Sequence, residues 1–249
     1  MSAIRLGTRA STLATTQSEM VAGLLRSEGL DVNLTTITTH GDTSTASLAA
    51  MGGIGVFASA IRAALLEGEA DIAVHSFKDL PTGRPLGLAI GAVPARADPR
   101  DALVARDGLT LHDLPQEASV GTGSPRRAAQ LLAVRPDLTI VDIRGNVDTR
   151  LGRVKGLGRY AKNGGKEDLD AVVLAASGLA RLGHSGAVTE FLDPSVVLPA
   201  PAQGALAVEC RTADSRHGKL AKALARIDDR RTRLAATAER AVLSHLEAG

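Results

Sequence analysis

Two proline-rich segments interrupt an otherwise regular alternation of short apolar strands and helices. They are residues 94–101, Pro-Ala-Arg-Ala-Asp-Pro-Arg-Asp, and residues 198–204, Leu-Pro-Ala-Pro-Ala-Gln-Gly. Proline cannot donate a hydrogen bond to a sheet and fixes its own φ, so neither segment continues a strand. Alternating strands and helices indicate an α/β fold. Two crossings predict a first lobe that the chain leaves, and to which it returns after building a second.

The two crossings give a division of the chain. Lobe 1 is expected to comprise residues 1–95 and 198–216, and lobe 2 residues 100–194. Apolar runs predict strands at 4–8, 32–37, 72–74, 86–93, 119–122, 138–143, 171–175 and 205–210. Apolar residues at helical spacing predict helices at 13–25, 57–65, 128–134, 177–182 and 230–247. In the last helix, one buried face is expected from Leu234, Ala238, Ala241, Val242 and His245.

Composition limits the classes of function that fit. The chain has 249 residues, of which 44% are hydrophobic, so it can bury a core. An aromatic content of 2% argues against base-stacking nucleic-acid modules, and a net charge of +2 gives no broad basic field. Only six of the 29 basic residues are lysine, so 23 are arginine, which binds carboxylates in a bidentate way. The arginines suggest an anionic ligand, although codon bias alone would also explain them.

Cysteine use and hydropathy bear on the compartment. Cys210 is the single cysteine, which fits a reducing compartment. No stretch approaches the roughly 20 apolar residues of a membrane span, and the amino terminus lacks a signal-peptide pattern. The sequence therefore predicts a cytoplasmic protein.

Titratable side chains gather in the stretch from Asp71 to Pro81. The predicted strand 72–74 is followed at its carboxyl end, a usual position for chemistry, by His75, Ser76, Lys78 and Asp79. Pro81 prevents the strand from continuing, so the charged residues are expected in a loop. His75 and Ser76 by themselves do not make a Ser-His-Asp site, because neighbours on a strand point to opposite faces.

A second group of polar residues follows the predicted strand 119–122. Ser124 is a natural N-cap, with Pro125 at the first helical position. Arg126 and Arg127 then lie at the positive end of the helix dipole, where a cation costs about 0.3 to 1 kcal/mol. We therefore expect an anion to compensate them.

The predicted strand 138–143 also ends at arginines. Asn146 can cap the helix that carries Arg150, which places Arg150 near Arg144. Residues 155–168 are rich in Gly and Lys and are expected to form an exposed loop without chemistry. The six histidines lack i, i+4 pairs and no Cys/His cluster exists, so no metal site is predicted.

Several motifs occur in order along nearly the whole chain. They are Arg5-Leu-Gly-Thr-Arg9 with Ser11, the stretch 71–81, Asp98-Pro-Arg-Asp-Ala102, Gly121-Thr-Gly-Ser-Pro-Arg-Arg127, Arg144-Gly-Asn146 with Thr149-Arg150, and Gln203-Gly204 ahead of Glu209-Cys210. In content and separation they resemble the hydroxymethylbilane synthase family, also called porphobilinogen deaminase. The resemblance implies a transferase of tetrapyrrole biosynthesis that joins four porphobilinogen molecules head to tail and loses ammonia each time. The family builds its product on a dipyrromethane cofactor attached to the enzyme.

The resemblance also implies a fold and a set of partners. The two lobes would be periplasmic-binding-protein-like, with a cleft between them, and residues 217–249 would begin an incomplete third α/β domain. Porphobilinogen is the expected partner of a monomeric protein, with no nucleic acid and no membrane.

Individual roles follow from the same resemblance. Asp79 is the implied catalytic residue, because a carboxylate there could stabilise the cation left by loss of ammonia and could move protons. The implied cofactor-binding residues are Lys78, Thr122, Ser124, Arg126, Arg127 and Arg144. The implied substrate-binding residues are Arg9, Ser11, Arg144 and Arg150. On this interpretation His75 and Ser76 are scaffold.

Three features depart from the family pattern. Ile54 stands where many members carry Lys in a Gly-rich loop, and residues 155–168 are longer than the usual connection. The family joins its cofactor to a cysteine that would follow Gly249, and Cys210 matches an ordinary residue at a strand end. The 249-residue form is therefore expected to lack sustained turnover.

Two other functions would account for parts of the sequence. A non-catalytic two-lobe binding protein for anionic small molecules would share the arginines but would give no reason for Asp79. A nucleic-acid-binding regulator is disfavoured by the charge and by the aromatic content.

Overall fold

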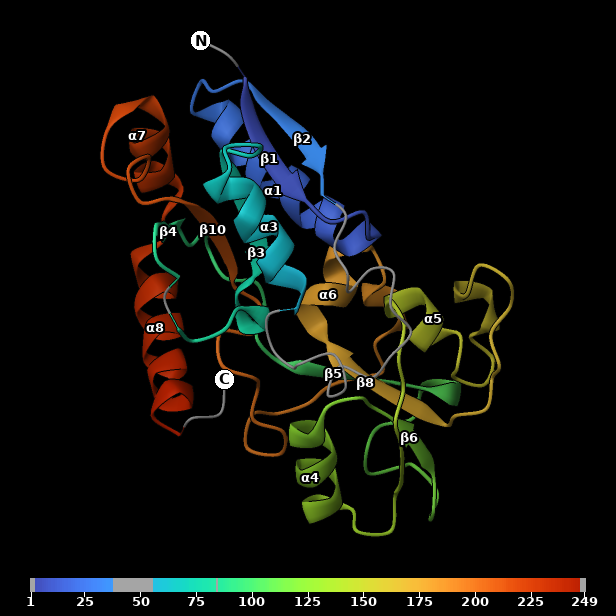
Figure 1. Cartoon of the computed structure of the whole chain (residues 1–249). Coiled ribbons are helices and arrows are strands. Elements are labelled where there is room, and N and C mark those ends of the chain that lie inside the picture. The colour runs from blue at the N-terminus through green and yellow to red at the C-terminus, as the bar shows by residue number, and fades with distance from the viewer. Residues whose placement is uncertain (1–2, 38–55, 84, 247–249) are drawn as a thin grey trace. The chain divides into compact units, whose positions relative to one another are not determined.

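The computed structural model describes residues 3–37, 56–83 and 85–246, which form two compact units (Figure 1). The first unit is Met1–Ala97 with Ala205–Gly249, and the second is Asp98–Gly204. Each contains one five-stranded mixed sheet, so the predicted α/β class is confirmed. No separate third domain is evidenced among the described residues, and its start at residues 217–249 stays a prediction.

The sheet of the first unit has the strand order β2-β1-β3-β10-β4. Its strands are β1 (Ile4–Thr8), β2 (Val32–Thr36), β3 (Ile72–Ser76), β4 (Leu88–Ala92) and β10 (Leu206–Arg211). β1 runs parallel to β2 and β3, whereas β10 runs antiparallel to both β3 and β4. The strand that the chain forms on returning from the second unit is therefore inserted between two strands made long before it.

Helices cover both faces of this first sheet, and the alternation of side chains along β3 shows how. Ile72 and Val74 belong to a core with α1 (Thr12–Ser27) and α7 (Gly218–Ile227). Ala73, which points the other way, packs with α3 (Val56–Leu66). A strand buried on both faces reads as a continuous apolar run, which is why 72–74 could be recognised from the sequence.

The second sheet has the order β7-β6-β8-β5-β9. Its strands are β5 (Asp101–Ala105), β6 (Ser119–Gly121), β7 (Thr139–Val141), β8 (Ala171–Ala175) and β9 (Glu190–Phe191). β6 is parallel to β7 and β8, and β5 is antiparallel to β8 and β9. In both sheets, the fourth strand is antiparallel and is the first that the chain forms after a crossing.

Helices also cover both faces of the second sheet. Leu103 of β5 lies in one core with α4 (Pro125–Val134). Val104 lies in the other core with α5 (Val147–Leu151) and α6 (Ala176–Arg181). Ser124 caps α4 and Asn146 caps α5, as the sequence predicts: each side-chain oxygen accepts a bond from a backbone N–H of the first turn. Short 3-10 helices are η1 (Phe77–Asp79), η2 (Arg106–Gly108), η3 (Gly158–Tyr160) and η4 (Ser185–Ala187).

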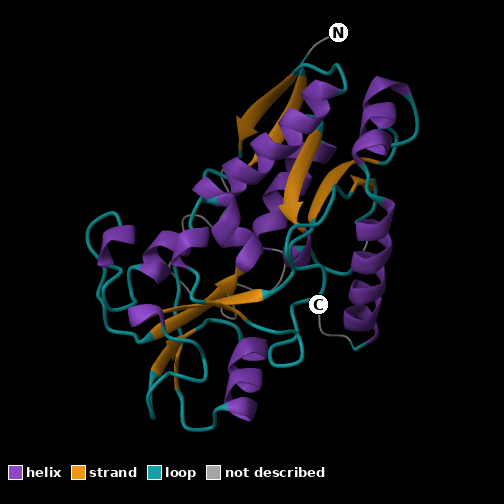
Figure 2. Ribbon diagram, turned by 180° about the vertical axis from the view of Figure 1, so that it is seen from behind, coloured by secondary structure: helices purple, strands orange, loops and turns teal. Residues whose placement is uncertain are grey.

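The last helix, α8 (Arg230–His245), packs differently from the prediction. Both views place α7 and α8 beside β10 and β4 (Figures 1 and 2). Leu234 is 60% exposed and Val242 61%, so the predicted buried face is wrong, and the buried residues are Thr232 and Ala236. The helix is held to its unit largely by polar contacts to the backbone, which an apolar pattern does not reveal.

Two further predictions concern local detail. β3 runs through Ser76, two residues further than predicted, so His75 is a strand residue and is buried. The Gly-rich loop around Ile54 lies outside the described residues.

Candidate functional site

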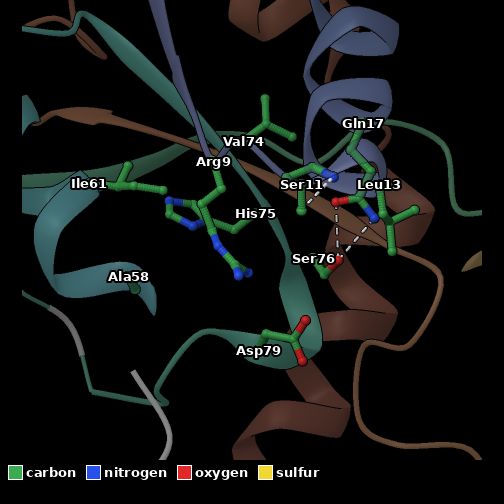
Figure 3. Close-up of a pocket in the computed structure, with 11 residues that line it drawn as sticks. Arg9, Ser11, Leu13, Gln17, Ala58, Ile61, Val74, His75, Ser76 and Asp79 are labelled. Atoms are coloured by element: carbon green, nitrogen blue, oxygen red, sulfur yellow. Dashed lines mark hydrogen bonds between the residues drawn. The ribbon is translucent and has the colours of Figure 1, made fainter. Parts of the chain in front are cut away.

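A pocket of about 110 Å³ lies in the first unit, where the carboxyl ends of β1 and β3 meet the first turns of α1 (Figure 3). Its walls come from the β1–α1 junction, from α3, from the end of β3 and from η1. The lining residues are Arg9, Ser11, Leu13, Ala14, Gln17, Ala58, Ile61, Val74, His75, Ser76 and Asp79. Three of the predicted site residues, Arg9, Ser11 and Asp79, are thus brought together in one cavity.

The amino terminus of α1 gives this pocket a positive side. Ser11 is the N-cap, and its hydroxyl accepts a bond from the backbone N–H of Ala14 at 3.4 Å. The first turn carries no acidic residue, so the positive end of the helix dipole is not neutralised from within. Together with the Arg9 side chain, this end of the helix favours an anion.

His75 and Ser76 leave β3 on opposite faces, as neighbours on a strand should. Ser76 faces α1, where its hydroxyl exchanges bonds with the Gln17 amide at 3.0 and 3.2 Å. His75 Nε2 lies 3.2 Å from Glu209 Oε2 of β10, and Glu209 also pairs with Arg62 of α3 at 3.0 Å. Burial raises the pKa of Glu209, but the contacts from His75 and Arg62 outweigh it and hold the pKa below its usual value.

Asp79 is the exposed carboxylate of the pocket. It ends η1, and Figure 3 shows it on the lower side of the view, below Arg9 and Ser76. The preceding Lys78 is half-buried and makes contacts of its own. Arg240 of α8 holds the backbone on either side of Asp79 by donating to three carbonyl oxygens of residues 77–81.

In the second unit, Arg126 and Arg127 are compensated by an acid that the sequence reasoning missed. Arg127 donates to Asp101 Oδ1 from two nitrogens, at 3.0 and 2.7 Å, and Arg126 donates to Oδ2 at 2.7 Å. Burial raises the pKa of Asp101. The charges of Arg127 and Arg126 lower it by more than burial raises it, so the pKa lies below its usual value. The anion expected at the start of this helix is therefore supplied, in large part, by the Asp101 carboxylate of the protein itself.

Gln203 completes the surroundings of Asp101. Its side-chain amide donates to Asp101 Oδ1 at 2.8 Å and to the Pro99 carbonyl at 2.7 Å. An acidic residue that opens an apolar strand, as Asp101 opens β5, was the available sequence signal. A carboxylate cannot enter such a core without partners, so it requires nearby cations.

The other predicted residues of the second unit lie near α4 and α5. Thr122 is buried and its hydroxyl accepts from the backbone N–H of Ser124 at 3.2 Å. Arg144 is half exposed, 3.6 Å from Asp142, while Arg150 donates to the Gly145 carbonyl at 2.8 Å. Burial lowers the pKa of Arg150 most, followed by the neighbouring charges of Arg127 and Arg144. This part of the second unit therefore has a surplus of positive charge.

Arg181 is a further cation that the sequence reasoning did not single out. One of its terminal nitrogens donates to the Gly204 carbonyl at 2.7 Å, while its Nε is buried without a hydrogen-bond partner. Burial lowers the pKa of Arg181. Nothing in the local sequence pattern distinguishes it from a surface arginine near the end of a helix.

The described residues contain neither a cluster of metal ligands nor a membrane-spanning helix. In residues 3–37, 56–83 and 85–246, no three His, Cys, Asp or Glu side chains gather as metal ligands. Over the same part of the chain, no helix has both the length and the hydropathy to cross a membrane.

Solved structures resemble the fold at low sequence identity. Apo YehZ from Escherichia coli aligns with a TM-score of 0.51 and 14% identity, covering 100% of this chain and 94% of that one. A nutrient binding protein from Burkholderia cenocepacia bound to methionine aligns with a TM-score of 0.50 and 16% identity, covering 89% and 91%. These likenesses concern the fold alone, and they agree with two periplasmic-binding-protein-like lobes.

Sequence relatives are much closer. A porphobilinogen deaminase from Micrococcus luteus is 56% identical, over 100% of this chain and 71% of its own length. One from Leifsonia xyli subsp. xyli is 58% identical, over 99% of this chain and 73% of its own length. Residues 4–219 match the family described as porphobilinogen deaminase, dipyromethane cofactor binding domain. The chain therefore belongs to the porphobilinogen deaminase family.

Proposed function

We propose that the protein acts as a porphobilinogen deaminase, a transferase that condenses four porphobilinogen molecules head to tail and releases ammonia at each step. The observation that carries the proposal is the exposed Asp79 carboxylate in a pocket that is also lined by Arg9 and by the amino terminus of α1. Family membership supplies the substrate class, and the pocket supplies groups of the right charge.

Asp79 is the proposed catalytic residue. Loss of ammonia breaks a C–N bond and leaves a cation on the substrate, which a nearby carboxylate stabilises. When the next pyrrole forms the C–C bond, its ring must lose a proton, and a carboxylate can accept it. One side chain thus serves both steps. Its exposure lets it reach the substrate and exchange protons with water.

Arg9 and Ser11 are proposed to bind the substrate. Porphobilinogen carries an acetate and a propionate arm, and both are anions at neutral pH. Arg9 and the amino terminus of α1 give a cation and backbone donors at one pocket wall. The arms would be held there while the reacting carbon faces Asp79.

The second unit is proposed to bind the dipyrromethane cofactor, whose arms are also carboxylates. Arg144 fits such arms and Arg150 is proposed to bind those of the substrate, because both lie in a region with a surplus of positive charge. Arg126 and Arg127 already donate hydrogen bonds to Asp101 with some of their N–H groups. They are proposed to bind the cofactor through their other N–H groups. When bound, the group supplies the pyrrole to which the first substrate is joined.

Cys210 does not fit as the attachment point for that group. It has no exposed surface, and burial raises the pKa of its thiol to about 11. A thiol of this kind is almost wholly protonated at neutral pH and is a poor nucleophile.

The test is an Asp79→Asn exchange in protein purified from its source organism, with ammonia release and porphobilinogen consumption as readouts. We expect turnover to fall by at least about 100-fold while porphobilinogen binding, measured calorimetrically, changes little. Asp31→Asn, an exposed carboxylate of the same unit, is the matched control. Full turnover in the Asp79 variant would contradict the proposal.

The alternative is a two-lobe binding protein for anionic small molecules. Its support is the likeness of the fold to a nutrient binding protein. It predicts ligand binding without ammonia release, and no functional difference between the Asp79 and Asp31 variants.

A further inference from the structure

Arg240, near the carboxyl end of α8, donates hydrogen bonds to the backbone of the loop that carries Asp79. Its guanidinium donates to the carbonyl oxygens of Phe77 at 3.0 Å, Leu80 at 2.8 Å and Pro81 at 2.6 Å. Its Cζ atom lies 4.6 Å from the centre of the Phe77 ring, which adds a cation–π contact. The three carbonyls bracket Asp79 in the sequence, so a single side chain fixes the backbone on both sides of it.

The contacts from Arg240 stabilise this loop, because the hydrogen bond within the loop itself is long. η1 is only three residues long, and the bond from the Leu80 N–H to the Phe77 carbonyl measures 3.4 Å. The end of a short helix leaves carbonyl groups without helical partners. Pro81 has no N–H to offer in return. Arg240 satisfies the carbonyls that this geometry leaves over.

The chemistry of the contact requires arginine. The planar guanidinium can donate in several directions within one plane, whereas a lysine ammonium is a compact point charge on a flexible stem. Arg240 is half-buried, and burial, followed by the nearby Arg62 charge, lowers its pKa. Burying the guanidinium is unfavourable unless its N–H groups are hydrogen-bonded, and three carbonyl oxygens accept these bonds.

The helix that presents Arg240 is itself anchored in the first unit. The neighbouring Glu239 pairs with Arg96 at 2.6 and 2.9 Å. The backbone N–H of Arg96 donates to Thr232 Oγ1 at 3.0 Å, and Asp229 caps the helix. A helix fixed at several points can hold the Arg240 side chain in one place.

We propose that Arg240 is a positioning residue: through the carbonyls of Phe77, Leu80 and Pro81 it sets where the Asp79 carboxylate stands in the pocket. The inference rests on the proposed function only for its catalytic consequence. The structural claim, that α8 controls the loop of Asp79, stands independently.

The test compares Arg240→Lys with Arg233→Lys in the full chain. Arg233 is a matched control on the same helix: it donates to the Ile90 and Gly91 carbonyls and pairs with Asp228, away from Asp79. We expect amide exchange in residues 77–82 to rise by at least about 10-fold in Arg240→Lys and to stay unchanged in Arg233→Lys. The ¹³C carboxyl resonance of Asp79, assigned with Asp79→Asn, should move only in the first variant.

Turnover adds a readout that a merely structural role would not move. In protein that consumes porphobilinogen, Arg240→Lys should lower kcat by about 10- to 100-fold with KM nearly unchanged, since misplacement of a reacting group costs rate more than binding. Arg233→Lys should leave kcat within about twofold. Equal effects of the two exchanges on kcat, or an unmoved Asp79 resonance, would overturn the inference.

The two proposals can fail separately. If the wild-type protein purified from its source organism does not consume porphobilinogen, the proposed function fails, and amide exchange and the Asp79 resonance still decide the role of Arg240. If Arg240→Lys does not fold, Arg240→Gln, which removes the buried charge but keeps an amide donor, takes its place in the same comparison.

Discussion

The Arg127 guanidinium donates twice to one oxygen of Asp101, at 3.0 and 2.7 Å, and the Asp101 side chain has no exposed surface. Arg127 also donates to the Val173 carbonyl of β8, so it ties β5, β8 and α4 together. A cation that looked from the sequence like a ligand-binding group is in this way also part of the core of its unit.

Replacing Asp101 with Asn should therefore destabilise the second unit. Two guanidinium groups would lose their carboxylate, and breaking a buried pair typically costs about 3 to 5 kcal/mol. Urea unfolding followed by circular dichroism measures the loss. Asp107→Asn is the control, since Asp107 is exposed and pairs only at the surface with Arg106. Equal stability of the two variants would contradict the structural role of Asp101.

Acid should weaken both units. The pKa values of Asp101 and Glu209 are lowered in the folded state. In the unfolded chain, the pKa is about 3.9 for Asp and about 4.3 for Glu. The stabilisation is therefore fully present above about pH 5 and is lost as the pH falls through the lower, folded pKa values.

The measurement of this acid effect is the unfolding free energy between pH 7 and pH 2. Its fall below about pH 4 should be shallower in Glu209→Gln and in Asp101→Asn, because each variant has one titrating group fewer. An unchanged slope in both variants would show that other carboxylates govern acid unfolding.

Arg150→Gln should separate ligand binding from stability. Arg150 is repelled by Arg127 and Arg144, so removing its charge should leave the unfolding free energy unchanged or slightly higher. If Arg150 binds a carboxylate arm, affinity for porphobilinogen should fall by about 10-fold, or 1.4 kcal/mol. Calorimetric titration and urea unfolding give the two values. Loss of stability without loss of affinity would assign Arg150 a structural role.

Cys210 should be inert in the folded protein. Its thiol is buried and its pKa is raised to about 11, so iodoacetamide should modify it only after denaturation. Intact-mass measurement before and after addition of urea checks this. The same spectrum should show no pyrrole adduct on Cys210. An adduct on Cys210 would contradict the assignment of its thiol as inert.

The sequence predicted elements best where one local pattern determines them. β1 and β8 have the predicted bounds: β8 is an uninterrupted apolar run, and in β1 the apolar Ile4 and Leu6 alternate with Arg5. Ser124 caps α4 as predicted, because the cap and the following Pro125 act over a few residues. Helix α7 and strands β5 and β9 were not predicted. β9 has only two residues, too few for a period to show.

What the sequence could not predict depends on contacts between distant residues. Asp101 and Arg127 meet because β5 lies next to β8, and the pairing order of a sheet is not written in any one segment. The face that α8 buries was predicted wrongly because Arg240 and Glu239 dock it through hydrogen bonds and charge rather than through apolar area. Polar docking of this kind has no 3.6-residue apolar signature.

The place of β10 has a consequence for the order in which the molecule is made. β3 and β4 pair only through β10 among the described strands, in contacts such as Ser76 with Leu206 and Leu88 with Arg211. The strands of the second sheet all lie within Asp98–Gly204, so that unit can close on itself first. During synthesis, β3 and β4 of the first unit lack the strand that lies between them until residues 206–211 leave the ribosome. The half of the protein that is translated first is therefore expected to finish folding last.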